Sequence, residues 1–286
     1  MKWLGGRESN NVEYSGRGGG GKLLGGGIGA GIIGLIIYLV TGYSPDQVNQ
    51  MAGEGNSAPV ETNKHFEKGS AGNFASIVLA ETEVIWDSLF RANGMTYKKP
   101  TLNVFEEEVN SACGGASAAV GPFYCPSDQK IYLDVTFFNE LKDRFGAPGD
   151  FANAYVIAHE VGHHIQYLMG TTQKMERMRN NGDRSGPNSA SVMLELQADF
   201  YAGVWAHYAE RMNSADNPVV IEPGDIQAAL NAANAIGDDR LQQQTQGRVV
   251  PDAFTHGTSK QRMYWFKKGY ETGDINQGDT FKELAN

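Results

Sequence analysis

The chain has 286 residues, which is enough for one substantial domain with extensions. Its formal net charge is −9 at pH 7, and its basic residues form no long run, so we expect no nucleic acid partner. Glycine is concentrated before residue 35, which sets the N-terminal region apart from the rest of the chain.

Residues 1–22 are polar and glycine-rich, and an uncharged stretch follows at residues 23–43. At about 1.5 Å per residue, roughly 20 helical residues match the roughly 30 Å hydrocarbon core of a bilayer. We therefore predict one transmembrane helix at residues 23–43. The alternative is an apolar helix that docks on the protein itself.

Basic residues precede this predicted span, and acidic residues follow it. The positive-inside tendency then predicts that residues 1–22 are cytoplasmic and that the region after the span is periplasmic. Small residues four apart, such as Gly25 and Gly29, would allow two spans to pack into a homo-oligomer. Residues 44–71 lack periodicity and are rich in polar residues, Pro and Gly, which predicts a flexible tether.

Residues 72–286 contain apolar patterns of both helical and strand period, with the helical pattern dominant. This predicts a mostly helical α+β domain with a small sheet. We expect strands at 101–105 and 130–135. Helices are expected at 74–92, 137–145, 151–169, 191–212 and 225–237, and from 258 onward. Residues 170–188 are polar and contain turn signals, so we expect a long loop there.

The helix expected after Asp150 contains His159-Glu160-Val161-Gly162-His163. Residues four apart share one helix face, with Cβ atoms about 5–6 Å apart, so His159 and His163 can bind one metal ion. Glu160 then lies beside the metal, where it can act as general base toward a bound water. The motif predicts a metal-dependent peptidase.

A third metal ligand is expected from another element, because catalytic zinc keeps three protein ligands and an open position. Glu195, in the helix expected at 191–212, is the candidate. Asp199 shares its face and would accept the second ring N–H of a ligand histidine, which fixes the tautomer. We therefore predict one zinc ion per chain. The alternative is a chance motif beside a solvated Glu–Asp pair.

Further segments support a family resemblance when they are taken together with these motifs. They are Cys113…Gly121-Pro122-Phe123-Tyr124-Cys125-Pro126, Ile131-Tyr132-Leu133-Asp134 and Thr255-His256-Gly257-Thr258. The chain resembles, over nearly its whole length, the YpfJ-like family of bacterial neutral zinc metallopeptidases. Its zinc-site layout also resembles the gluzincin group, which has glutamate as third ligand. The resemblance implies a zincin-like fold and hydrolysis of a peptide or protein substrate.

Two predictions concern the surroundings of the metal. The strand Ile131–Asp134 is the candidate sheet edge that would pair with an extended substrate, and an internal strand is the alternative. Cys113 and Cys125 are too far apart for a C-x-x-C zinc knuckle. We expect them to form a disulfide if the domain is external and to remain free thiols if it is cytosolic.

His256 lies just before a helix that Thr258 and Gln261 are expected to begin with a capping box. We predict that its imidazole donates to the oxyanion formed during hydrolysis, with a pKa held down by the helix dipole. The alternative is a histidine that only anchors its loop.

Two other functions compete with a membrane-anchored peptidase. The first is an inactive, zinc-stabilised binding or scaffolding module. Glu160 argues against this module, because a purely structural zinc site needs no base beside the metal. The second is a cytosolic enzyme whose apolar N-terminal segment serves as a docking helix.

Overall fold

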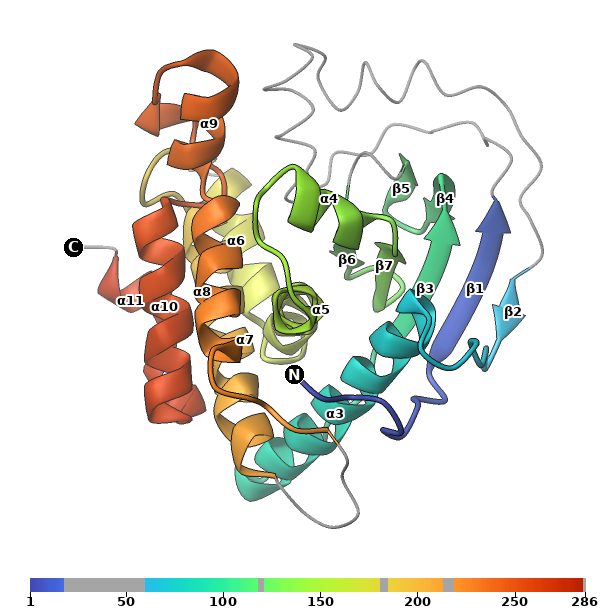
Figure 1. Ribbon diagram of the computed structural model, residues 1–286. Helices are drawn as coiled ribbons and strands as arrows, with labels where there is room; N and C mark the ends of the chain where they lie inside the picture. The colour runs from blue at the N-terminus through green and yellow to red at the C-terminus, as the bar shows by residue number, and fades with distance from the viewer. Residues whose placement is uncertain (18–59, 118–120, 181–184, 213–218, 285–286) are drawn as a thin grey trace.

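The computed structural model describes residues 1–17, 60–117, 121–180, 185–212 and 219–284. This part of the chain is mostly helical with a small mixed sheet, so the predicted α+β class is confirmed. Helix α5 (Asp150–Leu168) lies between the sheet and a helical group of α7 (Ala190–Arg211), α8 (Asp225–Ala235) and α10 (Ser259–Thr272) (Figure 1).

The main sheet has five strands in the order β2-β1-β3-β7-β6. They are β1 (Val12–Arg17), β2 (Glu61–Thr62), β3 (Thr101–Glu106), β6 (Phe123–Cys125) and β7 (Lys130–Asp134). β3 pairs in parallel with β1 and β7, whereas the outer strands β2 and β6 are antiparallel to their neighbours. A separate hairpin consists of β4 (Glu108–Ser111) and β5 (Gly114–Ser117).

Both faces of the sheet are covered by other parts of the protein. Successive side chains of a strand point to opposite sides, so the residues of β7 show what packs on each face. Ile131 and Leu133 of β7 lie in the main core with α3 (Ala71–Ala92) and α5. Tyr132, between them, packs with Phe105 and Cys125 in a second cluster on the other face. Helix α5, called the metal helix below because it carries His159 and His163, and the β4–β5 hairpin therefore lie on opposite sides of the sheet.

Helices α7 and α10 cross at very short distance, which only glycine permits. A Cβ atom on Gly203 would lie 2.0 Å from the carbonyl oxygen of Phe266, and one on Gly269 would lie 2.0 Å from that of Phe200. Any side chain at either position would force the helices apart. This close crossing brings α10 into the interior next to the helices that carry the predicted metal ligands.

Residues 1–17 fold together with the sheet. β1 pairs with β3, and Val12 is only 1% exposed. The buried carboxylate of Glu83, on α3, accepts hydrogen bonds from Ser9 Oγ at 2.5 Å and Asn11 Nδ2 at 2.7 Å. Since β1 and β3 pair directly, they lie on the same side of any membrane. A single span at 23–43 that separates the N-terminus from the domain, as expected from the charge pattern, is incompatible with this pairing.

Residues 60–71, expected to belong to the tether, also contact the domain. β2 pairs with β1, and the backbone N–H of Lys64 donates to the carbonyl of Val12 at 3.0 Å. The predicted span 23–43 and residues 44–59 lie outside the described residues. None of the described helices is both long and apolar enough to cross a bilayer.

Most predicted elements are confirmed with small shifts at their ends. The helix expected at 137–145 is α4 (Phe137–Asp143). The helix expected after Asp150 is α5, which already begins at Asp150, and the carboxylate of Asp150 accepts from Trp3 Nε1 at 2.8 Å. The prediction of a long loop at residues 170–188 is wrong, because helix α6 (Thr171–Asn180) occupies its first half. The remaining elements are α9 (Asp238–Gln246), α11 (Thr280–Glu283) and the short 3₁₀ turns η2 (Pro251–Ala253) and η3 (Ile275–Gln277).

Candidate metal centre

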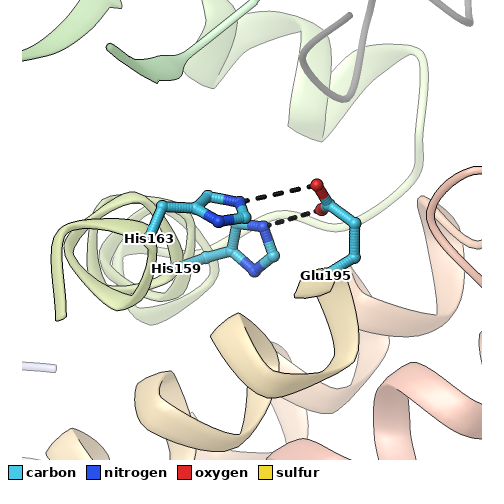
Figure 2. Close-up of side chains that lie close together, drawn as sticks. All are labelled: His159, His163 and Glu195. Carbon is cyan, nitrogen blue, oxygen red and sulfur yellow. Dashed lines mark hydrogen bonds and ion pairs between the residues drawn. The ribbon is translucent and has the colours of Figure 1, made fainter. Parts of the chain in front are cut away.

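The three predicted metal ligands converge at the contact between α5 and α7. His159 and His163 extend from α5 toward the carboxylate of Glu195 on α7 (Figure 2). Glu195 Oε2 lies 3.2 Å from His159 Nε2, and Oε1 lies 3.6 Å from His163 Nε2. Each of the three residues offers one possible ligand atom, and these three atoms all lie within 4.8 Å of one another. Among the described residues, this is the one such group of His, Cys, Asp and Glu side chains.

These distances fit a zinc ion. Tetrahedral zinc with bonds of about 2.0–2.1 Å holds neighbouring ligand atoms roughly 3.3 Å apart. The two nitrogen–oxygen distances, 3.2 and 3.6 Å, lie on either side of that value. Two imidazoles and one carboxylate are also a donor set that zinc accepts in catalytic sites. The residues present therefore fit the metal that the motif predicts.

Hydrogen bonds on the far side of each ring orient both histidines. His159 Nδ1 donates to Asp199 Oδ1 at 2.9 Å, and His163 Nδ1 donates to Gln166 Oε1 at 2.9 Å. A neutral imidazole protonated at Nδ1 carries its lone pair on Nε2. When both rings are neutral, as zinc binding requires, their two lone pairs and the Glu195 carboxylate face one another. A cation between them would turn this repulsion into attraction.

The local charges favour a cation at the same point. Burial lowers the pKa of His159, but Asp199 and Glu195 outweigh burial and raise that pKa to about 9. Burial raises the pKa of Glu195, but His163 and His256 outweigh it and hold the pKa well below its usual range. The site therefore stabilises positive charge next to an ionised carboxylate.

Glu160 is buried beside the predicted ligands, with 2% of its surface exposed. Burial raises the pKa of its carboxyl group above the usual value, and the nearby His163 and His159 partly oppose that shift. A carboxylate with a raised pKa accepts a proton more readily near neutral pH, which is the property that a general base needs.

Gly162 explains how α5 and α7 come close enough to share a metal. A Cβ atom at this position would lie 2.8 Å from the carbonyl oxygen of Ala198 and 3.0 Å from its Cα. The backbone of α7 therefore occupies the space that a side chain would need. Glycine inside the motif lets Glu195 approach both imidazoles.

Asp199 is fully buried in a network that the sequence predicts only in part. Arg262 of α10 donates to it twice, from Nε to Oδ2 at 2.8 Å and from Nη2 to Oδ1 at 2.9 Å. Tyr155 donates its hydroxyl to Oδ1 at 2.5 Å. Burial raises the pKa of Asp199, but Arg262 and His159 outweigh burial and lower the pKa to about 2. Asp199 therefore stays ionised and holds the His159 ring in place.

Four residues of this site are not predicted from the sequence, and they differ in how strongly the sequence around them points to a role. Tyr155 and Gln166 lie at helical spacing from the motif histidines, so the helix period could have identified them. In the sequence, Arg262 stands out only as a charged residue next to the aromatic residues 264–266. Asp238 has no local signal, because the backbone groups that it binds lie 17–19 residues later.

His256 lies in the loop before α10 and is 2% exposed. Asp238 Oδ2 accepts from its backbone N–H at 2.7 Å and from those of Thr255 and Gly257 at 2.8 and 3.0 Å. The ring Nδ1 lies 3.3 Å from Asp238 Oδ1. These contacts fit the loop-anchoring alternative, whereas the electrostatic coupling of the ring to Glu195 fits a role at the metal centre.

The expected pKa of His256 is wrong in direction. Burial lowers it, but the carboxylates of Glu195 and Asp238 outweigh burial, so the pKa is raised. The predicted helix start is confirmed, since Thr258 and Gln261 form a complete capping box at the beginning of α10. The neighbouring carboxylates therefore favour the charged form of this ring.

The predicted substrate edge is also wrong. Ile131, Tyr132, Leu133 and Asp134 belong to β7, which pairs with β3 on one side and β6 on the other. The outer strand at this end of the sheet is β6. Its Tyr124 hydroxyl lies 2.9 Å from Nδ1 of His164, the residue after the predicted ligand His163. In the described part of the chain, β6 is thus the sheet edge joined to the metal helix.

Cys113 and Cys125 form a disulfide, which is one of the two predicted alternatives for this pair. Cys113 lies in the turn of the β4–β5 hairpin, and Cys125 ends β6. The bond therefore ties the hairpin to the edge strand.

Comparison with known proteins places the chain in a family. It is 46% identical over 290 residues to the Escherichia coli (strain K12) protein named "Uncharacterized protein YpfJ", covering 98% of this chain and 99% of that protein. It is 42% identical over 238 residues to "Uncharacterized protein Rv2575" of Mycobacterium tuberculosis (strain ATCC 25618 / H37Rv), covering 78% of this chain and 80% of that protein. No solved structure matches it. The family described as "Putative neutral zinc metallopeptidase" matches residues 1–281, and the chain belongs to that family.

Proposed function

We propose that this protein is a zinc-dependent peptidase with one zinc ion held by His159, His163 and Glu195. The observation that carries the proposal is the geometry of these three side chains. Both Nε2 atoms face one carboxylate at 3.2 and 3.6 Å, and Glu160 lies buried beside them. The family description supports a hydrolase of this kind.

Each residue has a distinct role in the proposed reaction. A zinc ion held by His159, His163 and Glu195 would supply a Lewis acid for the scissile carbonyl and would make water a stronger nucleophile near neutral pH. Glu160 accepts the proton of the attacking water and passes it to the leaving amine. Asp199 keeps His159 in the tautomer that leaves Nε2 free. His256 donates to the oxyanion that develops on the scissile carbonyl.

The substrate in this proposal is an extended peptide that adds a strand to β6. Edge strands bind peptides through their unpaired main-chain N–H and C=O groups. β6 has β7 on one side, and it contacts α5 through Tyr124. A peptide along the outer side of β6 would therefore run beside the helix that carries His159 and His163.

We further propose that the domain works in an oxidising, extracytoplasmic compartment and that residues 23–43 associate with the membrane. The disulfide supports the compartment, since such bonds persist outside the cytosol. The uncharged composition of residues 23–43 supports the membrane association, and their paired small residues support self-association. Because β1 pairs with β3, we place residues 1–17 on the same side as the domain.

The alternative is a zinc-stabilised binding module without catalytic activity. Purified full-length protein, incubated with unfolded casein, would be compared before and after zinc removal by a chelator and after zinc is restored. The proposal predicts cleavage that stops with the chelator and returns with zinc. One zinc per chain by metal analysis, together with no cleavage of casein or of a proteome-derived peptide library, would favour the binding module.

A further inference from the structure

The outer strand β6 is attached to its surroundings on both faces of the sheet. Its central residue, Tyr124, points toward α5, and the residues on either side of it point toward the β4–β5 hairpin. This follows from the alternation of side chains along a strand. A three-residue edge strand with pairing on one side has few ladder hydrogen bonds of its own. Side-chain attachments therefore decide how firmly it is held.

On the side of the sheet that faces α5, the Tyr124 hydroxyl forms a hydrogen bond with the side chain of His164 on α5. His164 Nε2 donates to the backbone carbonyl of Lys98 at 2.6 Å, which leaves His164 Nδ1 as an acceptor. The Tyr124 hydroxyl donates to that nitrogen at 2.9 Å. His164 is fully buried, so its ring has little freedom to follow a moving strand. This pair fixes the spacing between β6 and α5 one residue from the predicted ligand His163.

On the opposite face, the disulfide holds the end of β6. Cys125 is fully buried among Phe105, Val109 and Tyr132, and its partner Cys113 belongs to the hairpin turn. Phe123 stacks on Tyr132 with ring centroids 4.9 Å apart and an interplanar angle of 10°. A covalent bond and a ring stack thus hold the residues that flank Tyr124.

We infer that Tyr124 and the Cys113–Cys125 disulfide are positioning groups for the substrate, which fix the outer edge of β6 at a constant distance from the metal helix. The inference rests on the proposed function, because it requires a peptide to pair with β6. A fixed edge presents its main-chain groups in one register, whereas a loosened edge must first be ordered, at a cost in conformational entropy. In the described part of the chain, the Tyr124 hydroxyl bonds to His164 and the two cysteines bond to each other, so these groups act on a peptide through the strand.

Binding can be measured without turnover in a zinc-loaded Glu160→Gln background, with fluorescein-labelled unfolded casein as the probe and fluorescence anisotropy as the readout. Tyr124→Phe removes one hydroxyl and should raise the Kd about 2- to 10-fold, the range that corresponds to one hydrogen bond. Cys113→Ala with Cys125→Ala should raise it by at least as much. Zinc content should stay at one per chain in both variants.

Tyr270→Phe is the matched control, because it removes a hydroxyl that donates to the carboxylate of Glu210 at 2.8 Å, between α10 and α7. It should leave the Kd unchanged. Hydrogen exchange should become faster at the β6 amides in Tyr124→Phe and stay at the wild-type rate in α5. An unchanged Kd in Tyr124→Phe, or an equal rise in Tyr270→Phe, would overturn the inference.

Activity separates failure of this inference from failure of the proposed function. With the catalytic Glu160 restored, Tyr124→Phe should raise KM and leave kcat near the wild-type value. If Tyr124→Phe lowers kcat at constant KM, the inference fails and the peptidase proposal stands. If zinc-loaded wild-type protein binds casein without cleaving it and Tyr124→Phe weakens that binding, the peptidase proposal fails and the positioning role stands.

Discussion

The metal centre and the N-terminal segment are held by contacts of very different sequence range. At the metal centre, His159 and His163 are four residues apart on α5, and Glu195 lies on α7, the second helix after it. In the N-terminal segment, β1 pairs with a strand about 90 residues later, and Ser9 and Asn11 bind Glu83. Both regions are buried, yet only the metal centre has two of its main groups, His159 and His163, placed by neighbouring residues on one helix.

The two regions therefore depend on different features of the fold. The metal centre depends on the face of a helix, which a local repeat determines. The N-terminal segment depends on the closure of a long loop, since parallel strands need a crossover connection, here including α3. We therefore expect substitutions at the metal centre to change metal binding and catalysis while the fold persists. Substitutions in β1 should instead change stability.

The largest effect is expected at Glu160. Glu160→Gln keeps the shape of the side chain but removes the proton acceptor, so hydrolysis should fall about 10²- to 10⁴-fold with zinc still bound. Cleavage rates of a labelled peptide and zinc content by mass spectrometry measure the two properties separately. Near-wild-type cleavage by a zinc-loaded variant would mean that another group is the base.

The next effect is expected at His256. His256→Ala should lower kcat and leave KM nearly unchanged, because oxyanion donors stabilise the transition state by about 2.7–4 kcal/mol in other hydrolases. Asp238 holds the loop through three backbone N–H groups, so the loop should persist without the imidazole. His65→Ala, at a side chain that is 65% exposed, is the control. A variant that unfolds, or one that cleaves at the wild-type rate, would leave His256 as a loop anchor.

A smaller effect is expected at Asp199. Asp199→Asn removes the charge that pairs with Arg262 and orients His159, and losses of this kind cost about 10- to 100-fold in metal affinity. Glu195→Ala should cost more, because it removes a direct ligand. Competition with a chromophoric chelator gives both affinities. Wild-type affinity in Glu195→Ala would place the third ligand elsewhere.

The sequence predicts the metal centre well because helical spacing converts directly into a shared face. It cannot assign the edge strand in the same way. Ile131–Asp134 has the composition of a strand at either an edge or an interior position, and its place depends on the pairing of β6 and β3 around it. Strand order is a property of distant contacts, and a pattern of five residues does not contain it.

The N-terminal strand is missed for a related reason. Val12–Arg17 contains serine, glycine and charged residues, so its composition suggests a polar tail. Only the partner strand shows that Val12 faces the core. Helix α6 is missed because most of its ten residues are polar, with Met175 as its buried residue. Local sequence patterns thus predict helices and strands that have a clear apolar face. They do not predict elements that form only because they pair or pack with a distant segment.

The role of β1 can be tested by a stability measurement. Val12→Ala removes two buried carbon atoms and should lower the free energy of unfolding by about 2 kcal/mol. Lys2→Ala, at a side chain that is 72% exposed, should change it by less than about 0.5 kcal/mol. Denaturant titration of the zinc-loaded protein compares them. Equal stability in both variants would show that residues 1–17 are a separate tail.

The smallest effect on the molecule is expected from two labelling variants, which test whether the N-terminus and the domain share one side of the membrane. The chain has two cysteines, and they form a disulfide, so the wild type should offer no free thiol. Lys2→Cys and Lys267→Cys each place one thiol at a side chain that is 72% or 62% exposed. Exposed ion pairs contribute little, so both variants should fold normally.

A membrane-impermeant maleimide, applied to intact cells with a permeable outer membrane, should label both positions alike. Labelling of both without lysis agrees with an extracytoplasmic domain. Labelling of both only after lysis contradicts that compartment but keeps the shared side. Labelling of Lys267→Cys alone would mean that a membrane separates β1 from β3 in the cell, which their direct pairing forbids. The pattern of two labels therefore tests the parallel strand pair independently of catalysis.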